Sequence, residues 1–269
     1  MIRMRSTLRL IAILFLALLL GNCSKDSETN PDPDPIDRSG NLLAAGESAA
    51  DLLTNTNFDQ LAVQIAYVEG FRPSDLALED LEEFLLLRTF KSAVRFEFLL
   101  LPSPNEATLT LQEIAALENE NRTLYNQGRT MGLYIYFADA PSSTDDPDGN
   151  SFTLGAVYRN TSMVLHESTI RELASKSAAI STAAAEAATL THEFGHLFGL
   201  VNLGTPEINP HEDPDAANHC LEEACLMEAS LEFTTGMAKI LEERAAKNFT
   251  IVPDLGPECL RDLQAIGGR

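Results

Sequence analysis

The chain is short of basic side chains. Its 269 residues hold 19 lysines and arginines against 40 aspartates and glutamates, so the net charge is −21 at pH 7. Three of the arginines lie in residues 1–22, which have no acidic side chain, so the chain from Cys23 onward has 16 basic and 40 acidic residues, a charge of −24. No basic patch could outweigh such a field, which excludes nucleic acid as a partner. The acidity favours solubility and a neutral or cationic substrate.

An apolar run stands near the N-terminus, from Leu10 to Leu20, and is too short to span a bilayer comfortably. It follows the three arginines and leads to small and polar residues and then Cys23, a pattern that predicts a secretory signal over residues 1–22. The "LGNC" ending resembles the lipobox of bacterial lipoproteins, although Asn22 is less usual there than Gly, Ala or Ser, and a soluble secreted form stays open. The resemblance implies a lipid on Cys23 that anchors the protein to the bacterial outer membrane. The following "SKDSE" resembles the tag of surface lipoproteins, so we expect the protein at the cell surface or facing the periplasm.

Apolar side chains are almost missing from the next segment. "SETNPDPDPIDRSGN", residues 27–41, cannot bury surface, so we expect residues 23–41 to form a disordered acidic tether. Residues 42–269 then form one domain of about 230 residues, in one or two lobes. With 45% hydrophobic residues the chain can build a core, and we expect a monomer.

Hydrophobic periodicity gives a coarse secondary structure for this domain. Strands are predicted at 60–69, 93–101 and 131–138, with one or two more or a hairpin at 154–168, and helices at 74–91 and 110–126. This order predicts an α+β fold with a mixed sheet that carries helices. No internal repeat is visible. A polar loop holds Asp145, Asp146, Asp148 and Asn150 but lacks the glycine of an EF-hand, so we expect a solvated turn, with calcium as the alternative.

The strongest helix pattern is "AAISTAAAEAATLTHEFGHLFG", residues 178–199. Its alanines supply helix propensity, and Gly199 suits a left-handed stop. His192 and His196 are four residues apart and so lie one turn apart on the same face. Two imidazoles at that spacing can hold a metal, and Glu193 lies close enough to polarise a water bound to it. The pattern therefore predicts a Zn²⁺ site at the end of a long helix.

A catalytic zinc takes three protein ligands, and the third is not where the longest version of this motif would place it. Asn202 stands there, and its neutral amide oxygen is a weaker donor than imidazole. Two histidines further on are the alternatives, His211 in "NPHEDPD" and His219 in "ANHCLEEACLM". The remaining histidine, His166, lies in a strand pattern and is expected to be structural or exposed.

The stretch from His192 to Met227 resembles the archaemetzincins, in which H-E-x-x-H-x-x-G-x-x-H runs straight into C-x4-C-x-M. Here "HEFGHLFG" is followed, after an insertion at 201–218, by "HCLEEACLM". The stretch is also similar to metzincin-type zinc peptidase lipoproteins of Gram-negative bacteria. The resemblance implies that His219 is the third zinc ligand. It also implies a metzincin-like catalytic domain whose smaller C-terminal lobe carries a Met-turn, with Met227 beneath the metal.

Two features depart from the archaemetzincin pattern. Archaemetzincins use four cysteines, including a later C-x-x-C, for a second, structural zinc, whereas only Cys259 follows here. We therefore expect a Cys220–Cys225 disulfide, which suits an oxidising compartment, and Cys259 buried or unpaired. The insertion is the other departure, and it could bring His211 rather than His219 to the metal.

The chemistry implied is hydrolysis of a peptide bond in a protein or peptide substrate. Zinc would lower the pKa of a bound water, and Glu193 would act as general base and return the proton to the leaving amine. A strand within 154–165 would bind the substrate by strand addition. No cysteine lies between Cys23 and Cys220, which excludes a cysteine-switch latency segment. The alternatives are an inactive zinc-containing surface binding lipoprotein, a lipoprotein with an accidental motif, and a zinc hydrolase for another substrate class.

Overall fold

The computed structural model describes residues 37–146, 148 and 151–269. The predicted signal, the expected lipid site Cys23 and most of the expected tether lie outside these residues. Within the described part of the chain, no helix is long and apolar enough to cross a membrane. The expected disordered tether reaches too far, because its last residues, Ser39–Asn41, form a 3₁₀ helix, η1, in which Asn41 is buried.

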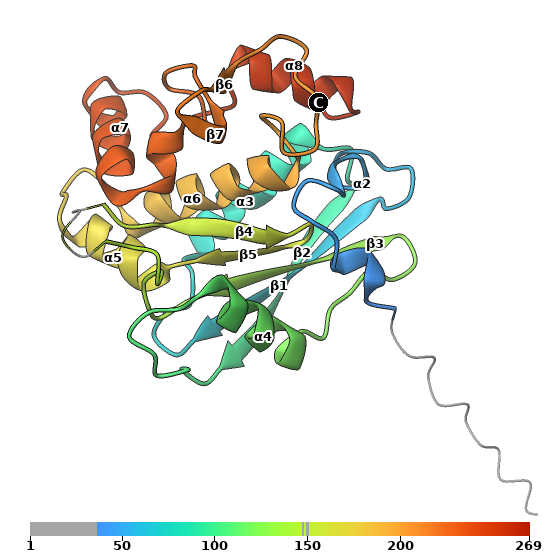
Figure 1. Cartoon of the computed structure of the whole chain (residues 1–269), viewed down its shortest axis with the longest axis horizontal. Helices are drawn as coiled ribbons and strands as arrows, with labels where there is room; N and C mark the ends of the chain where they lie inside the picture. Colours follow the sequence, from blue (N-terminus) through green and yellow to red (C-terminus); the bar gives the residue numbers. More distant parts are fainter. Residues whose placement is uncertain (1–36, 147, 149–150) are drawn as a thin grey trace, which may run out of the picture. The chain divides into compact units, whose positions relative to one another are not determined.

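A five-stranded sheet runs through the domain in the order β2-β1-β3-β5-β4 (Figure 1). Its strands in chain order are β1 (Gln60–Val68), β2 (Ala93–Leu101), β3 (Thr130–Phe137), β4 (Gly155–Arg159) and β5 (Ser162–Leu165). β1 pairs in parallel with β2 and β3, and β3 pairs in parallel with β5. β4 runs antiparallel to β5 and forms one edge. The predicted mixed sheet is therefore confirmed, and four of its five strands are parallel.

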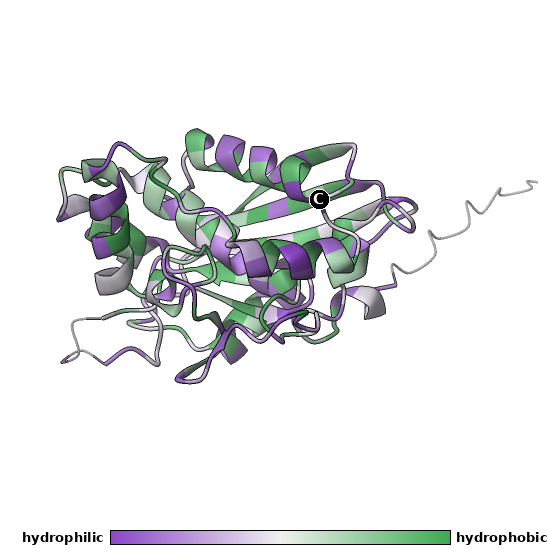
Figure 2. Ribbon diagram, turned by 90° about the horizontal axis from the view of Figure 1, so that it is seen from above, coloured by the Kyte–Doolittle hydropathy of each residue, from purple (hydrophilic) through white to green (hydrophobic). Residues whose placement is uncertain are grey.

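Helices pack on both faces of this sheet. They are α2 (Ala49–Leu53), α3 (Asp75–Arg88), α4 (Leu111–Asn121), α5 (Glu167–Ser175), α6 (Thr182–Leu197), α7 (Thr234–Ala246) and α8 (Pro257–Ala265). Alternation along β3 shows the two layers, since Leu133 and Ile135 join the core under α3 and α6, whereas Tyr134 and Tyr136 join the core under α4. Figure 1 shows α4 and α6 on opposite sides of the sheet. The helices in Figure 2 are banded green and purple, as expected when one face packs on the core and the other meets water.

The long helix α6 carries the histidine motif, as the sequence predicted. It begins at Thr182 rather than 178, because the Ser181 side chain caps it by accepting a hydrogen bond from the backbone N–H of Ala184. It ends where Gly199 takes φ +69°. The N–H of Leu200 then bonds the carbonyl of Gly195 at 3.2 Å, a Schellman stop. The chain therefore leaves the helix directly after the motif.

The last part of the chain lies on the α6 side of the sheet (Figure 1). The insertion forms the antiparallel hairpin of β6 (Glu212–Asp213) and β7 (Ala216–Cys220), followed by a 3₁₀ helix, η2 (Ala229–Glu232), and by α7 and α8. The hairpin, α7 and α8 were not predicted from the pattern of the sequence. The hairpin lies near the end of α6, whereas α7 packs against α5 and η2.

Candidate metal centre

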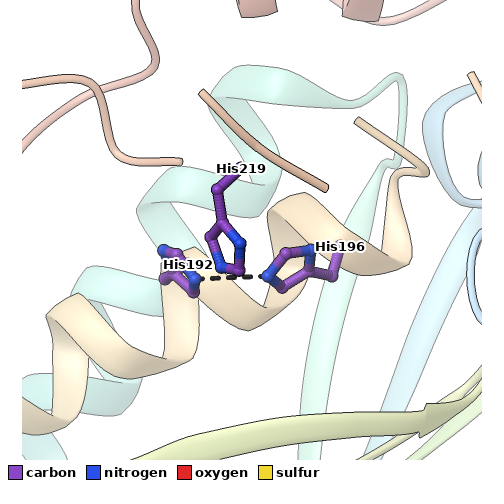
Figure 3. Close-up of side chains that lie close together, drawn as sticks. All are labelled: His192, His196 and His219. Carbon is purple, nitrogen blue, oxygen red and sulfur yellow. Dashed lines mark hydrogen bonds between the residues drawn. The ribbon is translucent and has the colours of Figure 1, made fainter. Parts of the chain in front are cut away.

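Three imidazoles meet at the end of α6. His192 and His196 project from the same face of the helix, and their Nε2 atoms are 3.2 Å apart (Figure 3). His219 comes from β7 and completes the group, with one ring nitrogen of each histidine within 4.8 Å of the others. All three side chains are buried. The hairpin thus brings His219, and not His211, to the two histidines of the motif.

Backbone carbonyls orient two of the rings. The carbonyl oxygen of Leu226 lies 2.7 Å from His192 Nδ1, and that of Ala217 lies 3.0 Å from His219 Nδ1. A carbonyl oxygen only accepts, so Nδ1 of each ring carries the proton and Nε2 points into the group. Burial lowers the pKa of His192 to about 4 and the pKa of His196 well below its usual value, with neighbouring histidines as the next cause. Both rings are therefore neutral at pH 7, the form that binds metals.

Glu193 lies between α6 and the edge strand β4. A Cβ added at Gly155 would come within 2.8 Å of Glu193 Oε1, so the carboxylate occupies the space that this glycine leaves. Its Oε2 is buried and has no hydrogen-bond partner among the described residues. Burial raises the pKa of Glu193 well above its usual range, and the charge of Glu232 adds to the shift. A cation beside the carboxylate would offset that shift.

Met227 packs directly beneath the motif. A Cβ at Gly195 would lie 2.1 Å from Met227 Sδ, so the helix and this side chain touch where only glycine fits. Met227 is fully buried, and its carbonyl accepts a 2.7 Å hydrogen bond from the N–H of Cys220. The turn that holds Met227 also presents the Leu226 carbonyl to His192.

Glu232, in η2, is a residue of this site that the sequence did not indicate. Its Oε2 lies 3.1 Å from His219 Nε2. No motif spacing marks this residue, because its place depends on a 3₁₀ turn and on a backbone hydrogen bond to Leu154 at the start of β4.

The remaining candidates lie away from the three histidines. The Asn202 amide donates to Glu212 at 2.7 Å, so its side chain braces the hairpin loop. His166 is buried beside α5, where its Nδ1 donates to the carbonyl of Ala140 at 2.9 Å. In the acidic loop, Asp145 Oδ1 accepts hydrogen bonds from the backbone and hydroxyl of Thr153, and Asn150 lies outside the described residues.

A second buried cluster surrounds His211. Its ring nitrogen and the sulfurs of Cys220 and Cys259 lie within 4.8 Å of one another. Cys259 Sγ is 3.5 Å from His211 Nε2 and 3.6 Å from Cys225 Sγ, so Cys225 lies next to this group of three, beside Cys259. The expected Cys220–Cys225 disulfide is wrong, because both cysteines are free. The four side chains come from the residue before β6, the end of β7, the following turn and α8.

The environment of this cluster favours the thiolate of one cysteine, Cys225, while hydrogen bonds to Cys225 raise the pKa of Cys220, and hydrogen bonds to Cys220 and Cys225 raise that of Cys259. Hydrogen bonds from the thiols of Cys220 and Cys259 lower the pKa of Cys225 to about 4. The backbone N–H groups of Met227 and Gly256 also donate to Cys225 Sγ, at 3.4 and 3.1 Å. His211 Nδ1 faces the carbonyl of Asn209 at 3.0 Å, so it carries the proton and Nε2 presents its lone pair to the sulfurs. One imidazole and three cysteines form a donor set that suits Zn²⁺.

Comparison with protein families gives no match, and neither does comparison with curated proteins. Among solved structures, the chain matches archaemetzincin from Methanopyrus kandleri with a TM-score of 0.42 and 14% sequence identity, over 78% of this chain and 96% of that chain. A match at this level carries no argument about function. The functional conclusion therefore depends on the side chains of the site.

Proposed function

We propose that the protein is a zinc-dependent endopeptidase. The observation that carries this conclusion is the meeting of three buried imidazoles at the end of α6, with the carboxylate of Glu193 set between that helix and an edge strand. This is the arrangement that metal-assisted hydrolysis of an amide needs, namely three protein ligands and one base on a rigid element.

The three histidines fit zinc by chemistry, and the pair on α6 fits it by distance as well. Zn–N bonds of about 2.0–2.1 Å in a tetrahedron separate two ligand nitrogens by about 3.3 Å. The 3.2 Å between the Nε2 atoms of His192 and His196 agrees with that separation. A zinc ion held there supplies a Lewis acid that polarises a carbonyl and lowers the pKa of water to about 7.

Glu193 is the general base in this proposal. Its Oε2 has no partner among the described residues, so it can accept the proton of the attacking water and return it to the leaving amine. Met227 is assigned to the Met-turn, where it supports the helix at Gly195. The edge strand β4 supplies main-chain groups for an extended peptide, which would add as a further strand beside Glu193.

The second cluster is assigned a structural zinc. Zinc–sulfur bonds of about 2.3 Å and zinc–nitrogen bonds of about 2.0–2.1 Å separate tetrahedral ligands by about 3.5–3.8 Å. The separations of 3.5 and 3.6 Å around Cys259 fall in that range. Such a metal would fasten α8 to the turn between His219 and Met227.

Metal analysis and a digest test both assignments. We expect two zinc ions per wild-type chain by elemental analysis, one lost in His219→Ala together with hydrolysis, and the other lost in His211→Ala. Glu193→Ala should keep both ions and lose cleavage of a peptide library, with a chelator-treated wild type as control. Two bound ions and no cleavage by the wild type would leave a zinc-containing binding protein instead, and full cleavage by Glu193→Ala would remove the role of Glu193.

Anchoring to the outer membrane through Cys23 is a separate proposal, supported by the lipobox-like sequence before that cysteine. Labelled palmitate should enter the wild type in a Gram-negative host and not Cys23→Ala. Equal labelling of the two proteins would exclude Cys23 as the lipid site.

A further inference from the structure

The strand β2 forms the edge of the sheet opposite to β4, and its outer side has no partner strand in the described part of the chain. It pairs only with β1, in a parallel register that runs without a shift from Ala93 to Leu101. No backbone hydrogen bond outside that pairing reaches β2 from another described element. The N–H and C=O groups along this edge are therefore free to pair with a further strand.

β2 lacks the features that usually protect an edge strand from such pairing. Protected edges are short, bulged, or interrupted by proline or by charged side chains. The other edge of this sheet follows the rule, because β4 has five residues and a register shift between Val157 and Arg159. β2 has nine residues, no register shift, and no proline until Pro102, which follows its end. Its length and regularity suit it to pairing.

Exposed apolar side chains also gather near this edge. The chain from the start of α3 to the end of β2 holds five of the twelve large apolar side chains that are exposed in the described residues, namely Leu76, Leu87, Phe90, Phe98 and Leu100. On β2 itself, Phe98 is 44% exposed and Leu100 is 56% exposed. Large apolar side chains gathered at the surface mark a site of interaction with another protein.

The two charged side chains of β2 determine which partner fits. Arg95 and Glu97 are 52% and 50% exposed, and they lie on the same face of the sheet because they are two residues apart. Within one copy of the chain they form an ion pair. Suppose that two copies of β2 pair antiparallel about a two-fold axis beside Phe96. Each Arg95 then lies directly opposite Glu97 of the second copy, and the two Phe96 side chains lie opposite each other on the other face.

Charge distinguishes this register from its neighbours. An axis beside Arg95 would place two arginines opposite each other, and an axis beside Glu97 would place two glutamates there. Opposite charges directly across two strands stabilise the pairing, whereas like charges destabilise it. Only the axis beside Phe96 places the two charged residues opposite each other. It also places Val94 opposite Phe98, which adds an apolar pair on the face of Phe96.

We propose that β2 is a dimer interface, at which two copies of this chain join their sheets edge to edge about an axis beside Phe96. The joined sheet has five strands from each copy, with β4 at both ends. The edge beside Glu193 therefore stays unpaired in the dimer. The dimer replaces the monomer expected from the sequence, and it does not depend on either zinc assignment.

Charge reversal tests the interface and its register together. The protein used is Ser24–Arg269, the chain without its predicted signal and expected lipid site, in about 0.15 M salt. There the Debye length is about 8 Å, so the net charge of −24 is screened while facing side chains still interact. Sedimentation velocity over a concentration series gives the dissociation constant of the dimer. We expect Arg95→Glu and Glu97→Arg each to raise it by about 10–100-fold, because two attractive pairs become repulsive.

A mixture of the two variants tests the register directly. Arg95→Glu carries two glutamates on β2 and Glu97→Arg carries two arginines, so both pairs are attractive when one copy of each meets. We expect the equimolar mixture to dimerise at least as tightly as wild type, although each variant alone is weakened. The double variant Arg95→Glu/Glu97→Arg should also dimerise like wild type, since it exchanges the two charges and keeps the pairs.

The matched controls change the same charges away from β2. Glu243 and Lys247 form an exposed ion pair at the end of α7. Lys247→Glu and Glu243→Arg alter the net charge by the same amounts as the two β2 variants, and we expect both to dimerise like wild type. Weakening by these controls as strong as that of the β2 variants would reduce the effect to net charge and overturn the interface.

Other results would overturn the proposal in different ways. A wild type that stays monomeric up to about 1 mM chain would remove the dimer. If the β2 amides of that monomer exchange slowly with solvent deuterium, residues 24–36 of the same chain cover the edge instead. A dimer that is equally tight in wild type and both single variants would be formed by another surface. Single variants that are weakened and a mixture that fails to dimerise would reject the axis beside Phe96.

Discussion

The contact between Gly195 and Met227 predicts that Gly195→Ala destabilises the protein, although a change of glycine to alanine inside a helix usually stabilises it. Glycine inside a helix costs about 0.5–1 kcal/mol relative to alanine, so Gly→Ala ordinarily stabilises. At Gly195 the added Cβ would lie 2.1 Å from Met227 Sδ and 3.0 Å from Met227 Cε, and both residues are fully enclosed. Forcing an extra methyl group into a packed core costs about 1–3 kcal/mol. We expect Gly195→Ala to lower the free energy of unfolding by about 1–2 kcal/mol after the helix gain is subtracted.

Thermal unfolding at fixed excess zinc measures this effect, because bound metal itself raises the melting temperature. A loss of 1–2 kcal/mol corresponds to a fall of about 2–8 °C in Tm for a domain of this size. The matched control is a double-mutant cycle with Met227→Ala, which alone should cost about 2–5 kcal/mol. In the absence of the Met227 side chain, Gly195→Ala should become neutral or stabilising, a coupling of about 1–3 kcal/mol. A higher Tm for Gly195→Ala alone would refute the close contact.

Three further predictions concern neighbouring features. Gly155→Ala should lower kcat by about 10–100-fold with zinc content unchanged, because its Cβ would displace Glu193 from the proposed metal site; unchanged turnover in a peptide assay would contradict this. Burial first, and the charge of Glu186 second, raise the pKa of Glu167 from 4.5 to about 9. Between those values the unfolded chain loses a proton that the folded protein keeps, so stability falls as pH rises by at most about 1.4 kcal/mol per pH unit. Glu167→Gln should flatten that fall and raise Tm at pH 8 relative to wild type, as a pH series of melting curves can check. Asn202→Ala should leave the zinc content at the wild-type value, since its amide bonds Glu212; loss of one ion on elemental analysis would restore Asn202 as a ligand.

The elements predicted from the sequence are those whose signal is local. β1, β2 and β3 lie within a residue or so of the predicted strands, because alternation and flanking turns mark them. The end of α4 was placed too late, at 126 rather than Asn121. Arg122 turns inward there, where its guanidinium donates to Glu118 and to the carbonyl of Leu124, and the chain becomes extended. A buried arginine with such partners is a tertiary feature that periodicity does not show.

The residues of the site also fall into those that local spacing predicts and those that tertiary packing places. His192, Glu193 and His196 lie on one helix, so their mutual placement follows from its pitch alone. His219 reaches them through a hairpin, and the pairing of His211 with Cys259 joins segments 48 residues apart. Neither follows from spacing, because each depends on how the hairpin and α8 pack against the end of α6.

Because the insertion folds into a hairpin, the position of His219 does not depend on how many residues the insertion contains. Gly199 fixes where the chain leaves α6, and the hydrogen bond between Cys220 and Met227 fixes where it returns. Between those two points, each doubling of loop length costs only about 0.6 kcal/mol of closure entropy. The loops within this segment could therefore be changed in length to reshape the approach to the histidines, provided that His211 and His219, which both lie between those two points, are kept.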